Sequence, residues 1–318
     1  STASIAGGNN HTCVGLSSGK VRCWGENKYG QLGNKSTKSS SRPVFVVNAK
    51  GKNHLKDVIQ VSGGGNTTCA LFRNKTVKCW GDNRFGELGN NSTTKSSKPV
   101  SVLRDTAMPA IRLGGVEQIA TSSSHSCALL SNHRVKCWGG NDSGQLGIGS
   151  QDGHPHKTPA YVQTSDEDSA PLENVNQIAA GGKSTCALLA DKSVKCWGAN
   201  DFGQIGNGDT SRREHPAPIF VRSSRSDSTR LTNVQQVSVG HNHACGLLEG
   251  GKVKCWGANH GAALKSNIYD SSFWFVPNPV FVSDKKSGST PLSNVTEISA
   301  GNEHTCGVLS DKRVKCWG

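Results

Sequence analysis

The twelve cysteines of this 318-residue chain form six pairs, and the two members of every pair lie ten residues apart. The pairs are Cys13 and Cys23, Cys69 and Cys79, Cys127 and Cys137, Cys186 and Cys196, Cys245 and Cys255, and Cys306 and Cys316. Successive first cysteines are separated by 56, 58, 59, 59 and 61 residues. A motif that returns at a nearly fixed period indicates a repeat architecture whose length changes lie in loops. We therefore predict six similar units that make up one domain over residues 1–318, because no second domain fits between them.

Each cysteine pair brackets two short runs with strand-like alternation. In the fourth copy these runs are Thr185–Leu189 and Ser193–Trp197, and residues 190–192 between them are typical of a turn. A hairpin of this length places Cys186 opposite Cys196. Directly opposed residues of an antiparallel ladder have Cα atoms about 4.5–5.5 Å apart, a separation that a disulfide spans. We therefore expect one disulfide across every hairpin.

Two further strand-like segments flank each hairpin. A β-rich segment that ends in Gly precedes it, as at 177–182, and a strand that begins with Pro is expected after most copies, as at 43–46 and 279–282. Pro suits an outermost strand, where fewer backbone N–H groups are needed. Four strands in each repeat predict an all-β fold, a six-bladed β-propeller. Gly318 follows the sixth motif Trp directly. The sixth blade is therefore expected to have three strands, to be completed by the other terminus, or to be completed by residues beyond this sequence.

A second fixed element runs from the motif Trp to a Gly nine residues later, as in Trp24–Gly33, Trp80–Gly89, Trp138–Gly147 and Trp197–Gly206. Together with the Gly-x-x-His-Thr-Cys that begins at Gly8, this pattern resembles the repeats of the regulator of chromosome condensation (RCC1) family. The resemblance spans nearly the whole chain and implies a propeller scaffold, which hosts many unrelated functions. The family usually builds seven blades, whereas this chain has six copies. Its founding member suggests one function, a guanine-nucleotide exchange factor or a chromatin-binding propeller inside the cell.

The even number of cysteines indicates an oxidising location, which is secreted, periplasmic or at the cell surface. The rival explanation is zinc, but nine intervening residues do not match the short ligand spacings of structural zinc sites. Residues 1–5 show no export signal, so we expect that any such signal has been removed. No apolar run approaches the ~18 residues of a membrane span, so we expect no transmembrane segment.

The formal net charge of +13 is compatible with an anionic partner, and the alternative is that the charge only promotes solubility. Nucleic acid is one such partner, because clustered Lys and Arg bind phosphate. The oxidising location makes nucleic acid the weaker candidate and favours a protein or an anionic glycan of the cell envelope. We expect a monomer.

Two repeated positions carry side chains with possible chemistry. A basic residue precedes the second cysteine of every pair, namely Arg22, Lys78, Lys136, Lys195, Lys254 and Lys315. Its stem is expected to cover the motif Trp while the charge reaches water, and a ring of anion-binding charge is the alternative. Histidine precedes the first cysteine in four copies, as His11, His125, His243 and His304. We expect these imidazoles to hydrogen-bond neighbouring loops rather than to gather around a metal, and we expect no cofactor.

Catalytic motifs are missing from the sequence, which has no Gly-x-Ser-x-Gly elbow, no phosphate-binding Gly-rich loop and no His-Glu-x-x-His. The sequence therefore predicts a non-enzymatic binding or adhesion scaffold that recognises its partner through loops on the propeller faces. A propeller hydrolase or lyase is a further alternative with little support.

The repeat pattern breaks in the fifth copy, where Ala262, Ala263 and Lys265 replace Gly, Gln and Gly. Sequence rules fail most often at functional or strained sites, and aromatic side chains are typical anchors of interfaces. We therefore predict that partner binding involves this region together with the basic connection that begins at residue 212. The candidate residues are Tyr269, Phe273, Trp274, Phe275, Arg212 and Arg213. The alternative is that the aromatic stretch covers its own blade.

Overall fold

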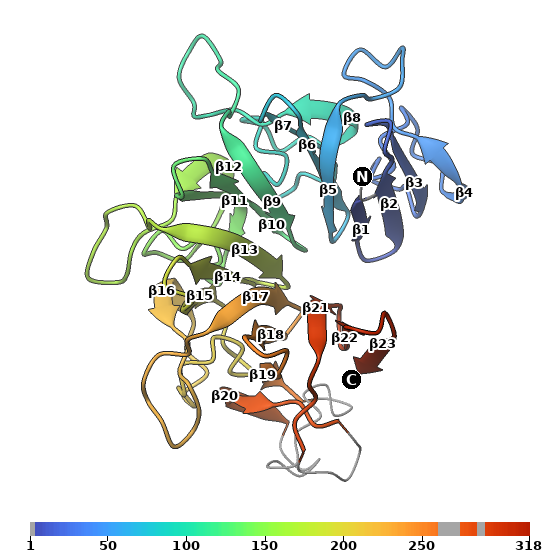
Figure 1. The fold of residues 1–318 in the computed structure, drawn as a ribbon. Coiled ribbons are helices and arrows are strands. Elements are labelled where there is room, and N and C mark those ends of the chain that lie inside the picture. The colour runs from blue at the N-terminus through green and yellow to red at the C-terminus, as the bar shows by residue number, and fades with distance from the viewer. Residues whose placement is uncertain (1–3, 260–273, 285–289) are drawn as a thin grey trace. The chain divides into compact units, whose positions relative to one another are not determined.

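The structure is a computed structural model that describes residues 4–259, 274–284 and 290–318, and every regular element in these ranges is a β-strand. Within these ranges there is no helix with the length and apolar character that a membrane crossing requires. The strands form six antiparallel sheets, hereafter blades 1 to 6, in each of which neighbours in sequence are neighbours in the sheet (Figure 1). The all-β, six-bladed propeller class predicted from the repeat is confirmed.

The chain divides into two compact units, residues 1–142 with 152–162 and residues 143–151 with 163–318. In the first unit, blade 1 consists of β1 (Ser4–Gly7), β2 (His11–Gly15), β3 (Val21–Gly25) and β4 (Ser40–Phe45); blade 2 of β5 (Val58–Gly64), β6 (Thr67–Phe72), β7 (Val77–Gly81) and β8 (Ser96–Ser101); and blade 3 of β9 (Val116–Thr121), β10 (His125–Leu130), β11 (Val135–Asn141) and β12 (Asp152–Tyr161). The prediction of a single domain over 1–318 stays a prediction.

In the second unit, blade 4 consists of β13 (Val175–Gly181), β14 (Ser184–Leu189), β15 (Val194–Gly198) and β16 (His215–Phe220); blade 5 of β17 (Val234–Val239), β18 (His243–Leu248), β19 (Val253–Ala258) and β20 (Phe275–Phe281); and blade 6 of β21 (Val295–Ala300), β22 (Thr305–Leu309) and β23 (Val314–Trp317). Among the described residues, blade 6 has three strands, which was one of the three possibilities that the sequence left open.

Every cysteine pair bridges the two central strands of one blade. Cys186 and Cys196 are directly opposed in the ladder of β14 and β15, and the other five pairs have the same register. The paired Cα atoms lie 4.0–4.1 Å apart in all six disulfides. The turn of the hairpin is closed by the N–H of Lys192, which donates to the carbonyl of Leu189 at 2.9 Å. The predicted disulfides and hairpin register are therefore confirmed.

The outermost strands of blades 1 to 5 contain the predicted prolines, such as Pro43 in β4 and Pro277 in β20. These strands begin upstream of the proline rather than at it, since β4 starts at Ser40 and β20 at Phe275. Pro is tolerated there because only one side of the outermost strand is paired within its sheet.

The motif tryptophans join successive blades within each unit. The side chains of Trp80, Trp138, Trp197 and Trp256 are fully buried. Each indole Nε1 donates a hydrogen bond of 2.8–3.0 Å to a backbone carbonyl in the loop between the third and the outermost strand of the preceding blade, that of Gln31, Glu87, Gln145 or Gln204. The indole therefore fills the space beside the neighbouring repeat and also satisfies its own donor.

Candidate partner-binding surface

The surface predicted to bind a partner is built on the loop between β15 and β16. This loop is anchored to the outermost strand of the next blade, because the N–H of Gly208 donates to the carbonyl of Pro277 at 2.9 Å. Gly203 lies so close to the same strand that an added Cβ would be 2.6 Å from the Cα of Pro277. Only a residue without a side chain allows this approach, and Gly203 also has a φ of +72°.

Side-chain hydrogen bonds shape the second half of this loop. The N–H of Asp209 donates to Oδ1 of Asn207 at 3.1 Å, and the N–H of Ser211 donates to Oδ1 of Asp209 at 2.8 Å. The bonds from Ser211 lower the pKa of the Asp209 carboxyl. His215 Nε2 lies 3.5 Å from Oδ2 of Asp209, while burial lowers the pKa of this imidazole. The loop is therefore held in one shape by its own polar side chains.

This loop carries Arg212 to the start of β20. The guanidinium carbon of Arg212 lies 4.9 Å from the ring centroid of Phe275, a cation–π arrangement. The backbone of Arg212 has a φ of +59°, and Arg213 beside it is exposed. Trp274 precedes Phe275 and exposes 68% of its surface. We call the set of Arg212, Arg213, Trp274 and Phe275 the Arg212–Phe275 surface.

The structure therefore brings together two residues that the sequence singled out for different reasons, an aromatic residue of the fifth repeat and an arginine of the fourth. Tyr269 and Phe273 lie outside the described residues, as do Ala262, Ala263 and Lys265. The binding role of all six candidates stays a prediction.

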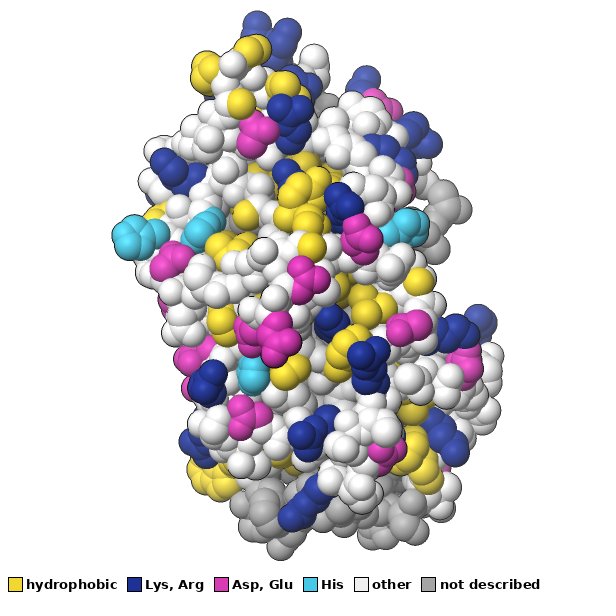
Figure 2. Space-filling model, turned by 90° about the vertical axis from the view of Figure 1, so that its left-hand side faces the viewer, with side chains coloured by type: hydrophobic (Ala, Val, Ile, Leu, Met, Phe, Trp, Pro, Cys, Tyr) yellow, Lys and Arg dark blue, Asp and Glu magenta, His cyan; other side chains and the backbone are white. Residues whose placement is uncertain are grey.

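The net positive charge is dispersed on the face shown in Figure 2, where Lys and Arg side chains are interspersed with Asp and Glu. Several cations have a carboxylate partner. Arg84 contacts Asp82 at 2.8 Å, and Lys192 contacts Glu249 in the next blade. Such exposed pairs add little stability, but they reduce the unbalanced charge available to an anion.

The predicted contact between the stem of the basic motif residue and the motif Trp stays a prediction. The expectation that its charge reaches water is wrong for Lys136, Lys195 and Lys254, which are buried. In four blades the cation lies over an aromatic ring of the outermost strand instead, 4.1–4.8 Å from its centroid, in the pairs Arg22 and Phe45, Lys136 and Tyr161, Lys195 and Phe220, and Lys254 and Phe281. The physical reason is register, because each cation is directly opposite that aromatic residue in the sheet. Strand alternation alone does not reveal which neighbouring strand supplies the partner.

Two of the four motif histidines, His11 and His243, hydrogen-bond the next blade as predicted. Nε2 of His11 lies 2.8 Å from Oγ1 of Thr68 in the next blade, and Nε2 of His243 lies 2.8 Å from Oγ1 of Thr305. Burial lowers the pKa of both imidazoles to about 4. In the described part of the chain, no three His, Cys, Asp or Glu side chains are grouped so that they could hold a metal ion.

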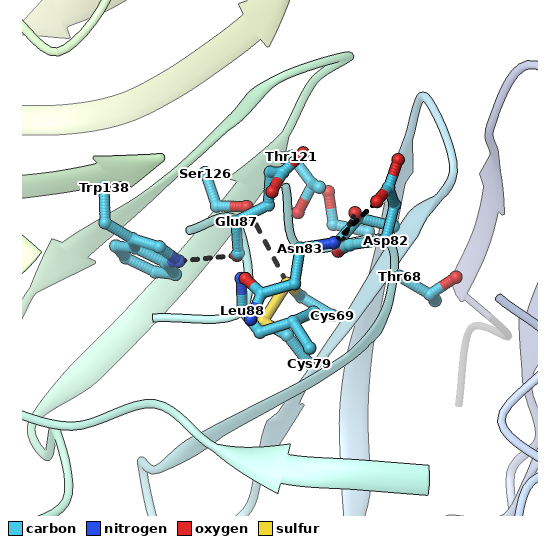
Figure 3. Close-up of a disulfide and its surroundings, with 12 residues drawn as sticks. Thr68, Cys69, Cys79, Asp82, Asn83, Glu87, Leu88, Thr121, Ser126 and Trp138 are labelled. Atoms are coloured by element: carbon cyan, nitrogen blue, oxygen red, sulfur yellow. Dashed lines mark hydrogen bonds between the residues drawn. A yellow bond between two sulfur atoms is a disulfide. The ribbon is translucent and has the colours of Figure 1, made fainter. Parts of the chain in front are cut away.

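One buried ionisable group escaped the sequence reasoning. Glu87 stands where the first, third and fourth repeats have Gln31, Gln145 and Gln204, and it is 2% exposed. Its Oε2 accepts a 2.9 Å hydrogen bond from the N–H of Phe85. Figure 3 shows Glu87 near the Cys69–Cys79 disulfide. Burial raises the pKa of this carboxyl to about 7. Aligning the repeats reveals the substitution, although it does not reveal the burial.

Two family models match the sequence. The model of the RCC1-like domain matches residues 1–267, and the model of the RCC1 repeat matches residues 295–318. The chain is 28% identical over 264 residues to the ultraviolet-B receptor UVR8 of Arabidopsis thaliana, an alignment that covers 82% of this chain and 54% of the receptor. It is 25% identical over 249 residues to the human E3 ubiquitin-protein ligase HERC2, covering 78% of this chain and 5% of the ligase. The chain thus spans about half of the first relative's length and a small part of the second's.

Solved structures share the fold. Yeast RCC1 (Prp20), in its crystal structure bound to Kap60, superposes with a TM-score of 0.74 at 22% identity, over 99% of this chain and 69% of that chain. The ectodomain of the Physcomitrella patens receptor kinase CR4 superposes with a TM-score of 0.51 at 18% identity, over 100% of this chain and 64% of that chain. With the family model matching most of its length, this disulfide-containing chain belongs to the RCC1-like domain family.

Proposed function

We propose that this chain is a non-enzymatic, extracytoplasmic binding propeller that recognises an acidic protein or an anionic glycan through its face loops. The observation that carries the proposal is the combination of six disulfides with a shaped, exposed, cationic and aromatic surface. The disulfides support an oxidising location, and the Arg212–Phe275 surface supports recognition.

The disulfides support the location because each blade has one and all twelve sulfur atoms are used. Disulfides persist in secreted and cell-surface proteins and are rare where glutathione keeps thiols reduced. The fold is compatible with such a location, since a solved structure that shares it is part of a receptor ectodomain. The matched relatives include an E3 ubiquitin-protein ligase as well, so membership of the family does not by itself decide the compartment of this chain.

The Arg212–Phe275 surface supports binding because its parts suit interfaces. An exposed Trp offers a large contact area, and Arg beside it offers five fixed donors to a carboxylate or a sulfate. The loop that presents Arg212 is ordered by its own hydrogen bonds, so little entropy is lost when a partner binds. An acidic protein surface and a sulfated or carboxylated glycan both fit this chemistry.

The location is tested by counting thiols. The protein is extracted from its native source in the presence of an alkylating reagent, denatured, and examined by mass spectrometry. We expect no alkylated cysteine. Twelve alkylated cysteines would overturn the extracytoplasmic location and favour the alternative, an intracellular exchange factor or chromatin-binding propeller.

The binding surface is tested by substitution. The double variant Trp274→Ser and Phe275→Ser and the variant Arg212→Ala are compared with Met108→Ser, which removes an exposed apolar side chain from the other unit. Binding is measured to a sulfated polysaccharide such as heparin and to an acidic protein fraction of the cell surface. We expect the first two variants to lose binding at least tenfold while Met108→Ser binds like the wild type. Equal binding by all variants would exclude this surface, and loss of thermal stability in the double variant would show that the rings belong to the core of blade 5.

A further inference from the structure

The lysine that precedes the second cysteine makes the same contact in successive blades. Its Nζ donates to the backbone carbonyl that opens the preceding connector, the segment between the outermost strand of one blade and the first strand of the next. The bonds join Lys136 to Arg104 at 3.2 Å, Lys195 to Thr164 at 2.6 Å, and Lys254 to Ser223 at 2.6 Å. These three lysines also lie over an aromatic ring. The ammonium group of each of these lysines therefore has two stabilising contacts, a backbone carbonyl and an aromatic ring.

Blade 6 makes the same contact with a different acceptor. Lys315 Nζ donates to the side-chain carboxylate of Asp284, which occupies the equivalent position at the start of its connector. A cavity of about 190 Å³ at this place is lined by Asp284, Arg313 and Lys315 among others. The repeat therefore already contains one example in which this lysine takes a carboxylate as its partner.

Lys78 of blade 2 is the exception. Its neighbour on the outermost strand is Ser101, so it has no ring to lie over. The carbonyl that would accept its proton belongs to Asn48, but this carbonyl already accepts a 2.8 Å hydrogen bond from the N–H of Gly51. The length of the connector explains this difference. It contains a β-bridge between Val47 and His54, which encloses only residues 48–53, the shortest such stretch of the five, so the chain turns back immediately. Within the described residues, the ammonium of Lys78 therefore has neither the carbonyl contact nor the ring contact that Lys136, Lys195 and Lys254 make.

A cavity lies where the missing partner would be. It has a volume of about 330 Å³, and its lining includes Lys78, Lys56, His54, Asn48, Asn53 and Asp57, all in the first unit. This volume suits a small molecule. Two lysines and the amides of two asparagines offer donors, and Asp57 is the one lining carboxylate that opposes an anion. Burial and the neighbouring Arg112 both lower the pKa of Lys78.

We propose that this cavity between blades 1 and 2 binds a carboxylate group, which pairs with Lys78 as Asp284 pairs with Lys315. The carboxylate belongs to a small free dicarboxylate or to an acidic side chain of a bound polypeptide. The inference is independent of the Arg212–Phe275 surface, which lies in the other unit. Either proposal can fail while the other stands.

The site is tested by calorimetric titration of the disulfide-intact protein at low ionic strength. The probes are succinate, a short end-blocked peptide with one Glu, and neutral succinamide. We expect succinate or the peptide to bind and succinamide not to bind. Binding of succinate identifies the free anion as sufficient, and binding of the peptide alone identifies an acidic side chain. If neither carboxylate binds, the proposal is wrong.

Matched variants locate the binding. Lys78→Met removes the charge and keeps the stem, whereas Lys195→Met makes the same change where the ammonium already has a carbonyl and a ring. We expect Lys78→Met to weaken binding at least tenfold, Lys195→Met to bind like the wild type, and Lys78→Arg to retain binding. In case Lys78→Met does not fold, Ser101→Tyr supplies the missing ring and is expected to weaken binding too. Unchanged affinity in both Lys78→Met and Ser101→Tyr would overturn the assignment.

Discussion

The indole Nε1 of Trp138 donates a 2.8 Å hydrogen bond to the backbone carbonyl of Glu87, a residue whose own carboxyl group is buried (Figure 3). In other blades the corresponding indole donates to the backbone carbonyl of a Gln. The side-chain amide of Gln is neutral, so its burial does not bury a charge. Blade 2 has therefore kept the backbone contact but buried an ionisable side chain in the loop between β7 and β8. This difference makes the stability of the first unit depend on pH near neutrality.

Glu87→Gln is expected to stabilise the protein at pH 8 and to have little effect at pH 5. The folded pKa of this carboxyl is about 7, above its ordinary value of 4.5, so the folded state binds the proton more tightly. Stability from this group is therefore present below pH 4.5 and is lost as the pH rises through 7. The loss at pH 8 is at most about 3 kcal/mol. Thermal unfolding of both proteins at the two pH values measures it, and a gain at pH 5 equal to that at pH 8 would contradict the titration.

The buried histidines are expected to destabilise the protein in acid. Their pKa values are lowered to about 4 from 6.5, so the unfolded state binds protons more tightly between these two values. The contribution of these histidines to stability is therefore constant above pH 6.5 and falls as the pH drops from 6.5 toward 4. The double variant His11→Gln and His243→Gln should show a shallower fall in midpoint temperature, because Gln can still reach the Thr hydroxyl without titrating. His241→Gln, at an exposed position, is the control, and a parallel fall in all three proteins would disprove this origin.

Gly33→Ala is expected to destabilise the protein by about 2–4 kcal/mol, from left-handed backbone strain and overpacking together. Gly33 has a φ of +64°, and an added Cβ would lie 2.7 Å from Nε1 of Trp80. Gly114→Ala is the matched control, since nothing lies within 4 Å of its added Cβ. Denaturant unfolding followed by Trp fluorescence compares the two variants, and equal midpoints would show that the indole has room to move.

The Cys306–Cys316 disulfide is expected to be reduced first in the 318-residue chain. The cysteines of the other five pairs are 0–1% exposed, whereas Cys316 is exposed on β23 of the three-stranded blade 6. A reductant must reach the sulfur atom, so access sets the order of reduction. Brief reduction followed by alkylation and peptide mass mapping reports the order. Simultaneous labelling of all twelve cysteines would indicate global unfolding instead.

The sequence predicted the repeated parts of this fold because several copies of each motif agree. The opposition of Cys186 and Cys196 and the proline-containing outermost strands both follow from patterns seen in most copies. Such features depend on local periodicity and hydrophobicity, which each repeat carries within itself.

The features that single copies carry were harder to predict. Lys78 shares its motif with five other basic residues, and its exception depends on Ser101 opposite and on the short connector 48–53 before it. The aromatic partner of Lys195 is Phe220, which lies 25 positions away in sequence and is adjacent only through the register of the sheet. Contacts of this kind arise from tertiary packing, which no single motif encodes. Arg212 and Phe275 were both selected from the sequence, but their contact became evident only from the fold.

Because each disulfide closes within its own hairpin, a gene segment that encodes one repeat carries both partners of the bond. Duplication or deletion of a whole repeat would add or remove two sulfur atoms that belong together and leave no orphan thiol to cross-link chains. An array of this kind can change its number of repeats in evolution without reorganising its oxidative chemistry.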